Sequence, residues 1–298
     1  MSKYIRFDWA MKRPLRNKAN FVVLEGFITA LLGKEIKILK LLESESNQDS
    51  AEAKQTRVDL LAEDSTGAKI IVEVQNESEY AYFQRILFGA SSLVTEYMRR
   101  GQGYENVQKI YSINIVYFDL GEGDDYIYHG TTEFRGIHTD SLLKLGPFQR
   151  EKFGTEEVSS LFPEYYILKV NGFNAVAKTP IEEWVRFFKD ESISATTTVP
   201  GLAEAREIML YEHMSPEEKR QYERHIDNLA LIRSNIDTAR GEGRAEGLAE
   251  GRAEGKAEGL AEGRIEGKAE GRAEERAAIV AKLRAQGFDD TFIESLLK

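Results

Sequence analysis

The sequence predicts an α/β domain, followed by a helical region and a repetitive tail. Three observations lead to this fold class. Apolar residues recur at helical spacing at about 17–32 and 80–100, strand-like segments lie between and after these two helices, and residues 241–275 repeat every four residues. The length of 298 residues suits one large domain or two ordinary ones, and a hydrophobic content of 42% is enough for a core.

The expected order of elements is helix, three strands, helix, strand, and then further β structure. In chain order we expect a helix at 17–32, strands at 36–42, 56–64 and 68–76, a helix at 80–100, and strands at 109–120, 126–135 and 165–170. Gly33 and Gly101 stand where glycine commonly ends a helix. The run 109–120 is rich in β-branched and aromatic residues, which favours a buried strand.

The chain divides into four expected parts. Residues 1–175 mix helical and strand patterns, as one α/β domain would, and 176–240 have helical patterns throughout. Residues 241–275 form the tetrapeptide repeat, which is either a linker or a helix. The last stretch, 276–298, has the pattern of a short helical piece, and a small docking hairpin suits it better than a DNA-binding helix-turn-helix.

Two positions in the helical region carry start signals for helices. Thr179 precedes Pro180, and a proline is well tolerated at the first helical position. Ser215 precedes Pro216, with Glu218 three residues after the serine, which is the spacing of a capping box. We therefore expect helices to begin at both sites.

The Gly-Ala-Glu repeat should form only a weak helix by itself. On a helix, glutamates four residues apart are like-charged neighbours, which destabilises it. Each glycine costs about 1 kcal/mol relative to alanine. Two interpretations remain: a flexible or partly helical linker, or a helix stabilised by close Gly/Ala packing against another copy of the chain, which would make the protein a homo-oligomer.

The composition excludes some kinds of site and indicates where in the cell the protein works. The chain has no cysteine, which excludes disulfides, thiolate zinc sites and cysteine nucleophiles. No segment approaches the roughly 20 apolar residues of a membrane span, and the basic N-terminus lacks the apolar run of a signal peptide. We therefore expect a soluble, cytoplasmic protein without a membrane partner.

A formal charge of -10 argues weakly against a protein that coats nucleic acid, because phosphate binding needs local lysine and arginine. One basic segment is nevertheless present near the N-terminus, formed by Lys12, Arg13, Arg16 and Lys18. It is either a solvated basic terminus or a surface that contacts phosphate.

A β-hairpin brings two acids together. With the loop 65–67, the numbers of paired residues sum to 132, so Asp59 lies opposite Glu73 and Arg57 lies opposite Gln75. Side chains alternate along a strand, so these four share one face of the hairpin. The other face is apolar and is expected to join the core; it carries Val58, Leu60, Val72 and Val74.

Two facing carboxylates repel each other unless a cation lies between them. Asp59 and Glu73 offer hard oxygen ligands, which suit Mg²⁺ or Mn²⁺ better than zinc. Such a metal can activate water and stabilise charge on a phosphodiester, with Gln75 orienting the water. The alternative is that Arg57 or Arg85 neutralises Asp59 in a salt bridge, while Glu73 is merely exposed to solvent.

The motif resembles a known nuclease superfamily. The segments RVDLLAED (57–64) and IIVEVQN (70–76) look like the D…E-x-Q variant of the PD-(D/E)XK signature. The run from 82 to 120 is similar to the bacterial recombination-promoting nucleases and transposases of that superfamily, and the likeness extends over about 5–240 and the style of the tail. The resemblance implies a restriction-endonuclease-like α-β-β-β-α-β core, DNA as partner and Mg²⁺ or Mn²⁺ as cofactor.

The resemblance also implies roles for individual residues. Asp59 and Glu73 fall on the metal-binding acids, and Gln75 takes the position of the motif lysine, although it cannot act as a cation. Arg85, on the following helix, would contact the phosphate or the water, or form a structural salt bridge to a hairpin acid. Glu25, on the first helix, would add a further acid to the metal, or serve on the helix surface or at a hinge.

Three hypotheses from different classes follow. The first is a Mg²⁺-dependent endodeoxyribonuclease that promotes recombination or movement of a mobile element. The second is a non-catalytic nuclease-like module that binds DNA or a partner and self-associates through its tail. The third is an assembly protein in which the repeat carries the function. The four histidines show no ligand spacing, and Trp9 and Trp184 are expected to anchor packing rather than to stack on bases.

Overall fold

A computed structural model of the chain describes residues 4–42, 59–98 and 102–287, and positions 289, 293, 295 and 296. Contacts divide the chain into two compact units, Met1–Asp227 and Asn228–Lys298. Arg57, Val58 and Gly101, to which the sequence assigns structural roles, lie outside the described residues. In the described part of the chain no helix has the length and apolar character needed to cross a membrane.

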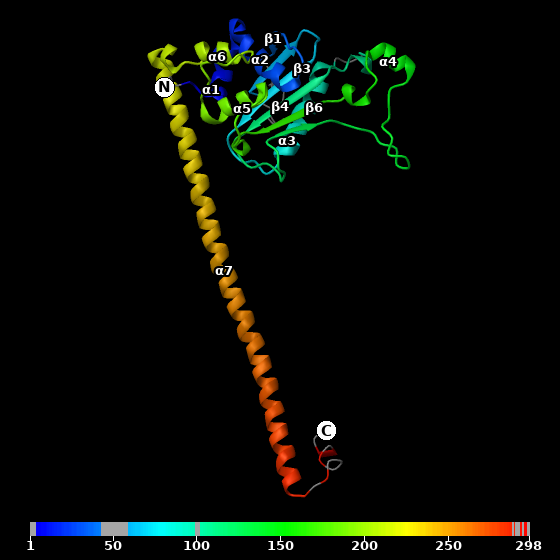
Figure 1. The fold of residues 1–298 in the computed structure, drawn as a ribbon, viewed down its shortest axis with the longest axis vertical. Helices are drawn as coiled ribbons and strands as arrows, with labels where there is room; N and C mark the ends of the chain where they lie inside the picture. Colours follow the sequence, from blue (N-terminus) through cyan, green and yellow to red (C-terminus); the bar gives the residue numbers. More distant parts are fainter. Residues whose placement is uncertain are drawn as a thin grey trace. The chain divides into compact units, whose positions relative to one another are not determined.

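The first unit contains the predicted order of helices and strands (Figure 1). The α-β-β-β-α-β order is formed by α2 (Phe21–Leu32), β1 (Ile38–Leu42), β2 (Leu60–Asp64), β3 (Lys69–Gln75), α3 (Tyr82–Tyr97) and β4 (Ile110–Val116). It is preceded by α1 (Phe7–Lys12) and by the short turns η1 (Pro14–Arg16) and η2 (Lys18–Asn20). It is followed by β5 (Ile127–Gly130), α4 (Pro147–Phe153), β6 (Glu164–Lys169), α5 (Pro180–Asp190), α6 (Leu202–Ile208) and α7 (Pro216–Ala285).

The six strands of the described residues form one mixed sheet in the order β1-β2-β3-β4-β6-β5. The pairs β1–β2, β2–β3 and β5–β6 are antiparallel, whereas β3–β4 and β4–β6 are parallel. In the hairpin Leu60 pairs with Val72 and Glu63 with Lys69, so the paired numbers sum to 132. The predicted register is therefore confirmed, and it places β3 in the interior of the sheet.

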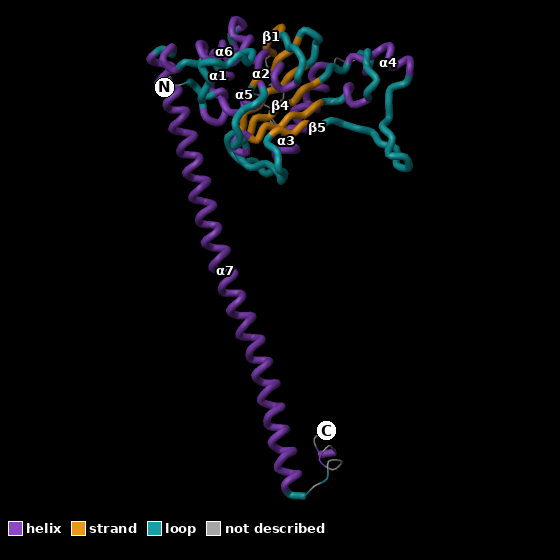
Figure 2. The backbone as a smooth tube through the Cα atoms, viewed as in Figure 1, coloured by secondary structure: helices purple, strands orange, loops and turns teal. Residues whose placement is uncertain are grey.

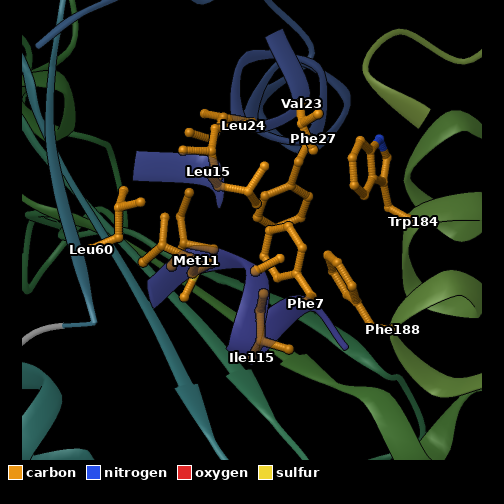
Figure 3. Packing of buried hydrophobic residues seen from close by; sticks show 14 of the residues in the cluster. Phe7, Met11, Leu15, Val23, Leu24, Phe27, Leu60, Ile115, Trp184 and Phe188 are labelled. Atoms are coloured by element: carbon orange, nitrogen blue, oxygen red, sulfur yellow. The ribbon is translucent and has the colours of Figure 1, made fainter. Parts of the chain in front are cut away.

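One face of the sheet is covered by α1, α2, α5 and α6 (Figures 1 and 3). Aromatic residues from three of these helices meet there: the rings of Phe7 and Phe27 lie 5.6 Å apart, and Phe27 lies 5.5 Å from Trp184. Trp184 is completely buried, so its predicted role as a packing anchor is confirmed. Leu60, Val72 and Val74 join this cluster, as expected for the apolar face of the hairpin.

The opposite face of the sheet is covered by α3, which packs through two separate apolar clusters. One cluster contains Leu61, Ile71, Ala90, Leu93 and Ile110. The other contains Tyr82, Ile86, Val116 and Phe118. Four buried polar residues of β3 and β4 belong to neither cluster: Lys69, which pairs with Glu63, and Glu73, Ser112 and Asn114. Burying polar groups is costly unless they are paired. Glu73, Ser112 and Asn114 therefore mark the candidate functional site on the face of the sheet that α3 covers.

The helical region shares the main core with the sheet. Phe188, Leu202 and Tyr222 belong to the same buried cluster as the residues of β3 and β4. Both predicted helix starts are formed: Thr179 accepts from the Glu182 N–H, and the Ser215 N–H donates to the Glu218 carboxylate at 2.8 Å.

Loops form much of the connection between β5 and β6, whereas the tail of the second unit is helical (Figure 2). Residues 241–275 lie within α7 and are exposed throughout, and each repeat glycine has open space where a Cβ would stand. A helix without packing partners gains nothing from burial. Both interpretations of the tail, linker and self-associating helix, therefore stay open.

Candidate functional site

Glu73 lies in the middle of β3 and points toward α3. Alternation along the strand sends Val72 and Val74 into the main core and places Glu73 on the other face. Its neighbour in the parallel ladder is Asn114 on β4. Only 8% of Glu73 is exposed, so the carboxylate is largely withdrawn from water.

Asp59 precedes the first paired residue of β2 and binds to the backbone of β3. Its Oδ2 accepts a hydrogen bond from the Val74 N–H at 2.9 Å. Two cations of the basic N-terminal segment reach the same residue. The Lys12 Nζ lies 3.6 Å from the Asp59 Oδ1, and the Arg16 guanidinium donates to the Asp59 carbonyl at 3.0 Å. The basic segment is thus placed beside the predicted acid.

Arg85 on α3 links Glu73 to a second acid. Its guanidinium lies 3.4 Å from the Glu73 Oε2 and 3.0 Å from the Glu79 Oε2. Burial raises the pKa of Glu73, Arg85 lowers it, and the negative charge of Asp59 raises it again, to about 7. The structure therefore brings Asp59, Glu73 and Arg85 into one electrostatic group in which positive charge does not fully compensate the acids.

Two polar residues of β4, which the sequence did not single out, complete the wall of this group. The Asn114 amide donates to the Ser112 Oγ at 3.1 Å, and the Tyr82 hydroxyl donates to the Asn114 Oδ1 at 3.4 Å. A small recess between β3, β4 and α3 is lined by Glu73 and these three residues. The signal for them was available: Ser112 and Asn114 are polar residues at alternate positions of an otherwise apolar strand.

The segment that contains these residues matches a known protein family. Residues 5–144 match the model of the PD-(D/E)XK nuclease family transposases. The match confirms the resemblance drawn from the sequence, and it covers the hairpin, α3 and the basic N-terminal segment. Neither the curated proteins nor the solved structures gave a match to this chain.

The sequence resemblance puts Gln75 at the position where the PD-(D/E)XK motif commonly has a lysine. It is the last residue of β3, on the same face as Glu73, and it is half-buried. Its backbone carbonyl accepts the Tyr117 N–H at 3.0 Å, which fixes the end of the strand. Within the described chain no residue hydrogen-bonds to the Gln75 side-chain amide, and its expected neighbour Arg57 lies outside that part.

Glu25 is not brought to the nuclease motif. Its Oε1 accepts the Ile38 N–H at 2.8 Å, and its Oε2 pairs with Lys37 at 3.4 Å. Ile38 is paired with Asp64, at the opposite end of β2 from Asp59. Five residues of strand span about 16 Å, too far for one metal ion to bridge. We therefore leave Glu25 out of the candidate metal site, because its carboxylate caps the start of β1.

A buried ionic network holds the segment that follows the motif. The Arg6 guanidinium donates to the Asn76 Oδ1 at 2.8 Å, and Asn76 donates to Asp8 at 3.2 Å. His225 of α7 lies 3.0 Å from the same Asp8 carboxylate. Burial raises the pKa of Asp8, but the bonds from His225 and the charge of Arg6 outweigh it and lower the pKa to about 2. The network ties α1 and α7 to the residue after Gln75.

The donor set suits a hard divalent ion. Mg²⁺ keeps several waters and binds proteins through one or two carboxylates together with substrate phosphates. Asp59 and Glu73 provide two such carboxylates. In the described residues no three or more acids, histidines or cysteines gather as a complete metal cage, so bound water and substrate would fill the remaining positions. A divalent cation would also supply the positive charge that the raised pKa of Glu73 indicates is lacking.

Proposed function

We propose that the chain is a metal-dependent DNA endonuclease that hydrolyses phosphodiester bonds. The observation that carries this proposal is Glu73, a largely buried acid on the motif strand of a nuclease family, with the charge of Asp59 close enough to raise its pKa. Acids kept in such surroundings are typical of functional sites, because burial costs stability unless the charge is used.

Each residue of the group has a role in the proposed reaction. Asp59 and Glu73 would hold Mg²⁺ or Mn²⁺. The metal, when bound, lowers the pKa of water and neutralises charge on the phosphate. Gln75 would orient the attacking water with its side-chain amide. Arg85, which is about one-third exposed, would turn from Glu73 and Glu79 toward the scissile phosphate.

The basic N-terminal segment supports DNA as the substrate. Lys12 and Arg16 contact Asp59 and are exposed, so a phosphate backbone that reaches the acid also reaches these cations. This local charge answers the objection raised by the formal charge of -10, since much of the acidic excess lies elsewhere in the chain. A role in recombination or in movement of a mobile element is part of the same proposal, and it rests on the family match.

A second function is favoured by a different observation. Arg85 and Lys12 already neutralise part of the acidic charge, and glutamine replaces the motif lysine. A nuclease-like module that binds DNA without cutting it, and that self-associates through its tail, would have these properties. It predicts DNA binding with no cleavage at any metal concentration.

Nicking of supercoiled plasmid separates the two functions. The purified chain is incubated with Mg²⁺, Mn²⁺, Ca²⁺ or EDTA, beside the variants Asp59→Asn and Glu73→Gln. Glu77→Gln is the matched control, because Glu77 is an exposed acid just beyond the motif. The nuclease proposal predicts cleavage with Mg²⁺ or Mn²⁺ by the native chain and the control, and a loss of about 100-fold or more in the two site variants. Cleavage that persists in both site variants would refute the assignment.

A further inference from the structure

A pocket lies beside the basic N-terminal segment, outside the acidic group. Its volume is about 140 Å³, and it lies between α1, η1 and the start of α7. The side chains that give it its chemistry are Trp9, Arg13, Leu210, His213, Met214 and Glu218. The walls from Leu210 onward lie beyond the residues 5–144 that match the nuclease family, so the family match assigns no role to the pocket.

The pocket and the proposed DNA surface share one segment of the chain. Arg13 is flanked in the chain by Lys12, which reaches the Asp59 carboxylate, and is followed three residues later by Arg16, which donates to the Asp59 carbonyl. The short segment from Lys12 to Arg16 therefore contacts Asp59 and also forms one wall of the pocket.

The interior combines a stacking surface with hydrogen-bond acceptors. The Arg13 guanidinium lies 4.9 Å from the centre of the Trp9 ring, and bases of unpaired nucleotides stack on such guanidinium planes. The Glu218 Oε2 accepts from the Ser215 N–H and hydroxyl, each at 2.8 Å, which holds the pKa of Glu218 below its usual range and leaves Oε1 for another donor. His213 Nδ1 lies 2.9 Å from the Glu207 carbonyl and must donate to it, so the Nε2 of the neutral ring is an acceptor.

Size and charge select among possible occupants. A cavity of about 150 Å³ takes up benzene, so this pocket accommodates a single aromatic ring system at its mouth. A free phosphate is disfavoured by the Glu218 carboxylate. A purely apolar ligand would take water from the His213 Nε2 and the Glu218 Oε1 without offering either atom a hydrogen bond. A planar ring that carries N–H donors satisfies both the stacking surface and the acceptors.

We propose that this pocket binds an unstacked nucleobase that carries an exocyclic amino group, beside the proposed cleavage site. The inference rests on the proposed action on DNA. Guanine, cytosine and adenine carry an amino group with two N–H donors for the acceptors of the pocket, whereas thymine offers a single ring N–H and no amino group. The pocket would thus favour single-stranded or distorted DNA, in which a base is free to leave the stack.

The test uses the indole N–H signals of the full-length chain in proton–nitrogen NMR spectra, recorded in EDTA. The chain has two tryptophans, and Trp184 is completely buried, so it is the internal reference. The spectra are titrated with dGMP, dCMP, TMP and deoxyribose 5-phosphate. We expect the Trp9 signal to shift with dGMP and dCMP, with TMP at least about tenfold weaker and with no response to the sugar phosphate.

Glu218→Gln supplies the decisive variant, with Glu217→Gln as its control. Glutamine keeps the capping box with Ser215 but replaces the charged acceptor, whereas Glu217 is exposed and does not line the pocket. The discrimination against TMP should disappear in Glu218→Gln and persist in Glu217→Gln. Equal shifts from all four compounds, or unchanged discrimination in Glu218→Gln, would overturn the proposal. Because EDTA prevents metal-dependent cleavage, a chain that never cuts DNA still reports on the pocket, and failure of one proposal is separate from failure of the other.

Discussion

The Asp59 carboxylate accepts a hydrogen bond from the Val74 N–H at 2.9 Å, and Val74 lies between Glu73 and Gln75 in the chain. The predicted acid is thus also the group that fixes the strand carrying the other two motif residues. Asp59→Asn keeps an oxygen for this bond, whereas Asp59→Ala removes it. We expect Asp59→Ala to lose about 1 kcal/mol more of unfolding free energy than Asp59→Asn. Urea unfolding measures the difference, and both variants should lose cleavage. Equal stability of the two would show that the bond contributes nothing.

Glu73 should make stability fall as pH rises in the absence of metal. Its pKa is 4.5 in a model peptide and about 7 in the folded chain, so the folded state binds more protons between these values. This contribution to the free energy of unfolding is fully present below about pH 4.5 and is lost as pH rises through about 7. The loss is on the order of 3 kcal/mol. Unfolding in EDTA at pH 5 and pH 8 should show this loss for the native chain and a smaller one for Glu73→Gln. The same slope in Glu73→Gln would contradict the assignment.

Arg85 should set the pH at which the site becomes active. Its charge lowers the pKa of Glu73, so Arg85→Ala is expected to raise that pKa further. The acidic limb of the pH–rate profile should then move to higher pH, while Arg85→Lys keeps most of the charge and moves it less. If Arg85 also contacts the phosphate, the plateau rate should drop about tenfold in Arg85→Ala. If the native chain, Arg85→Ala and Arg85→Lys had the same pH–rate profile, Arg85 would have no role in the site.

Asp8 should be the residue of the ionic network on which stability depends most. Asp8→Ala removes the buried carboxylate that Arg6 and His225 share, while Arg6 keeps its contacts to Asn76 and Glu191. We therefore expect a cost toward the lower end of the roughly 3–5 kcal/mol for breaking a buried pair. Asp119→Ala is the control, because Asp119 is exposed. Since the folded pKa of Asp8 lies at about 2, its contribution is present above about pH 4 and is lost as pH falls toward 2. Chemical unfolding at pH 7 and pH 3 would measure both effects, and a cost below about 1 kcal/mol would contradict this role.

The repeat tail should be a marginal helix in the monomer. Changing four repeat glycines to alanine, Gly247, Gly251, Gly255 and Gly259, should raise helix content, because each change favours helix by about 1 kcal/mol. Circular dichroism of the full chain and sedimentation at several concentrations distinguish the two interpretations. A self-associating helix packed through its glycines would lose oligomers in this variant, whereas a linker would only gain helix. A monomer at every concentration would remove the oligomer proposal.

The hairpin could be predicted because its determinants are local. A three-residue loop that ends in glycine sets the register of the hairpin. Because side chains alternate along a strand, Val72 and Val74 then lie on one face of the sheet and Glu73 on the other. The caps at Thr179 and Ser215 were predictable for the same reason, since each depends on residues three positions apart. In these segments the local preferences for turns and helix caps agree with the final fold.

Contacts between distant segments could not be predicted. His225 meets Asp8 across 217 positions, and nothing in either neighbourhood indicates the pair. The resemblance implied that Glu25 adds an acid to the metal, with a role on the helix surface or at a hinge as the alternative, but packing of α2 places its carboxylate at the start of β1. The role of Asn114 depends on which strand lies beside β3, and that is decided by the whole sheet. These positions follow from tertiary packing, which a single sequence does not encode in a readable local pattern.

The most direct test of the central claim is the rate of plasmid cleavage by the native chain and by Glu73→Gln as Mn²⁺ is raised. Glu73→Gln removes the buried charge with almost no change in shape, so it tests the metal site with little disturbance of the fold. The account predicts cleavage by the native chain that saturates with Mn²⁺ and is abolished by EDTA, and at least about 100-fold slower cleavage by Glu73→Gln at every concentration. Equal rates for the two proteins, or cleavage by neither while DNA remains bound, would contradict it.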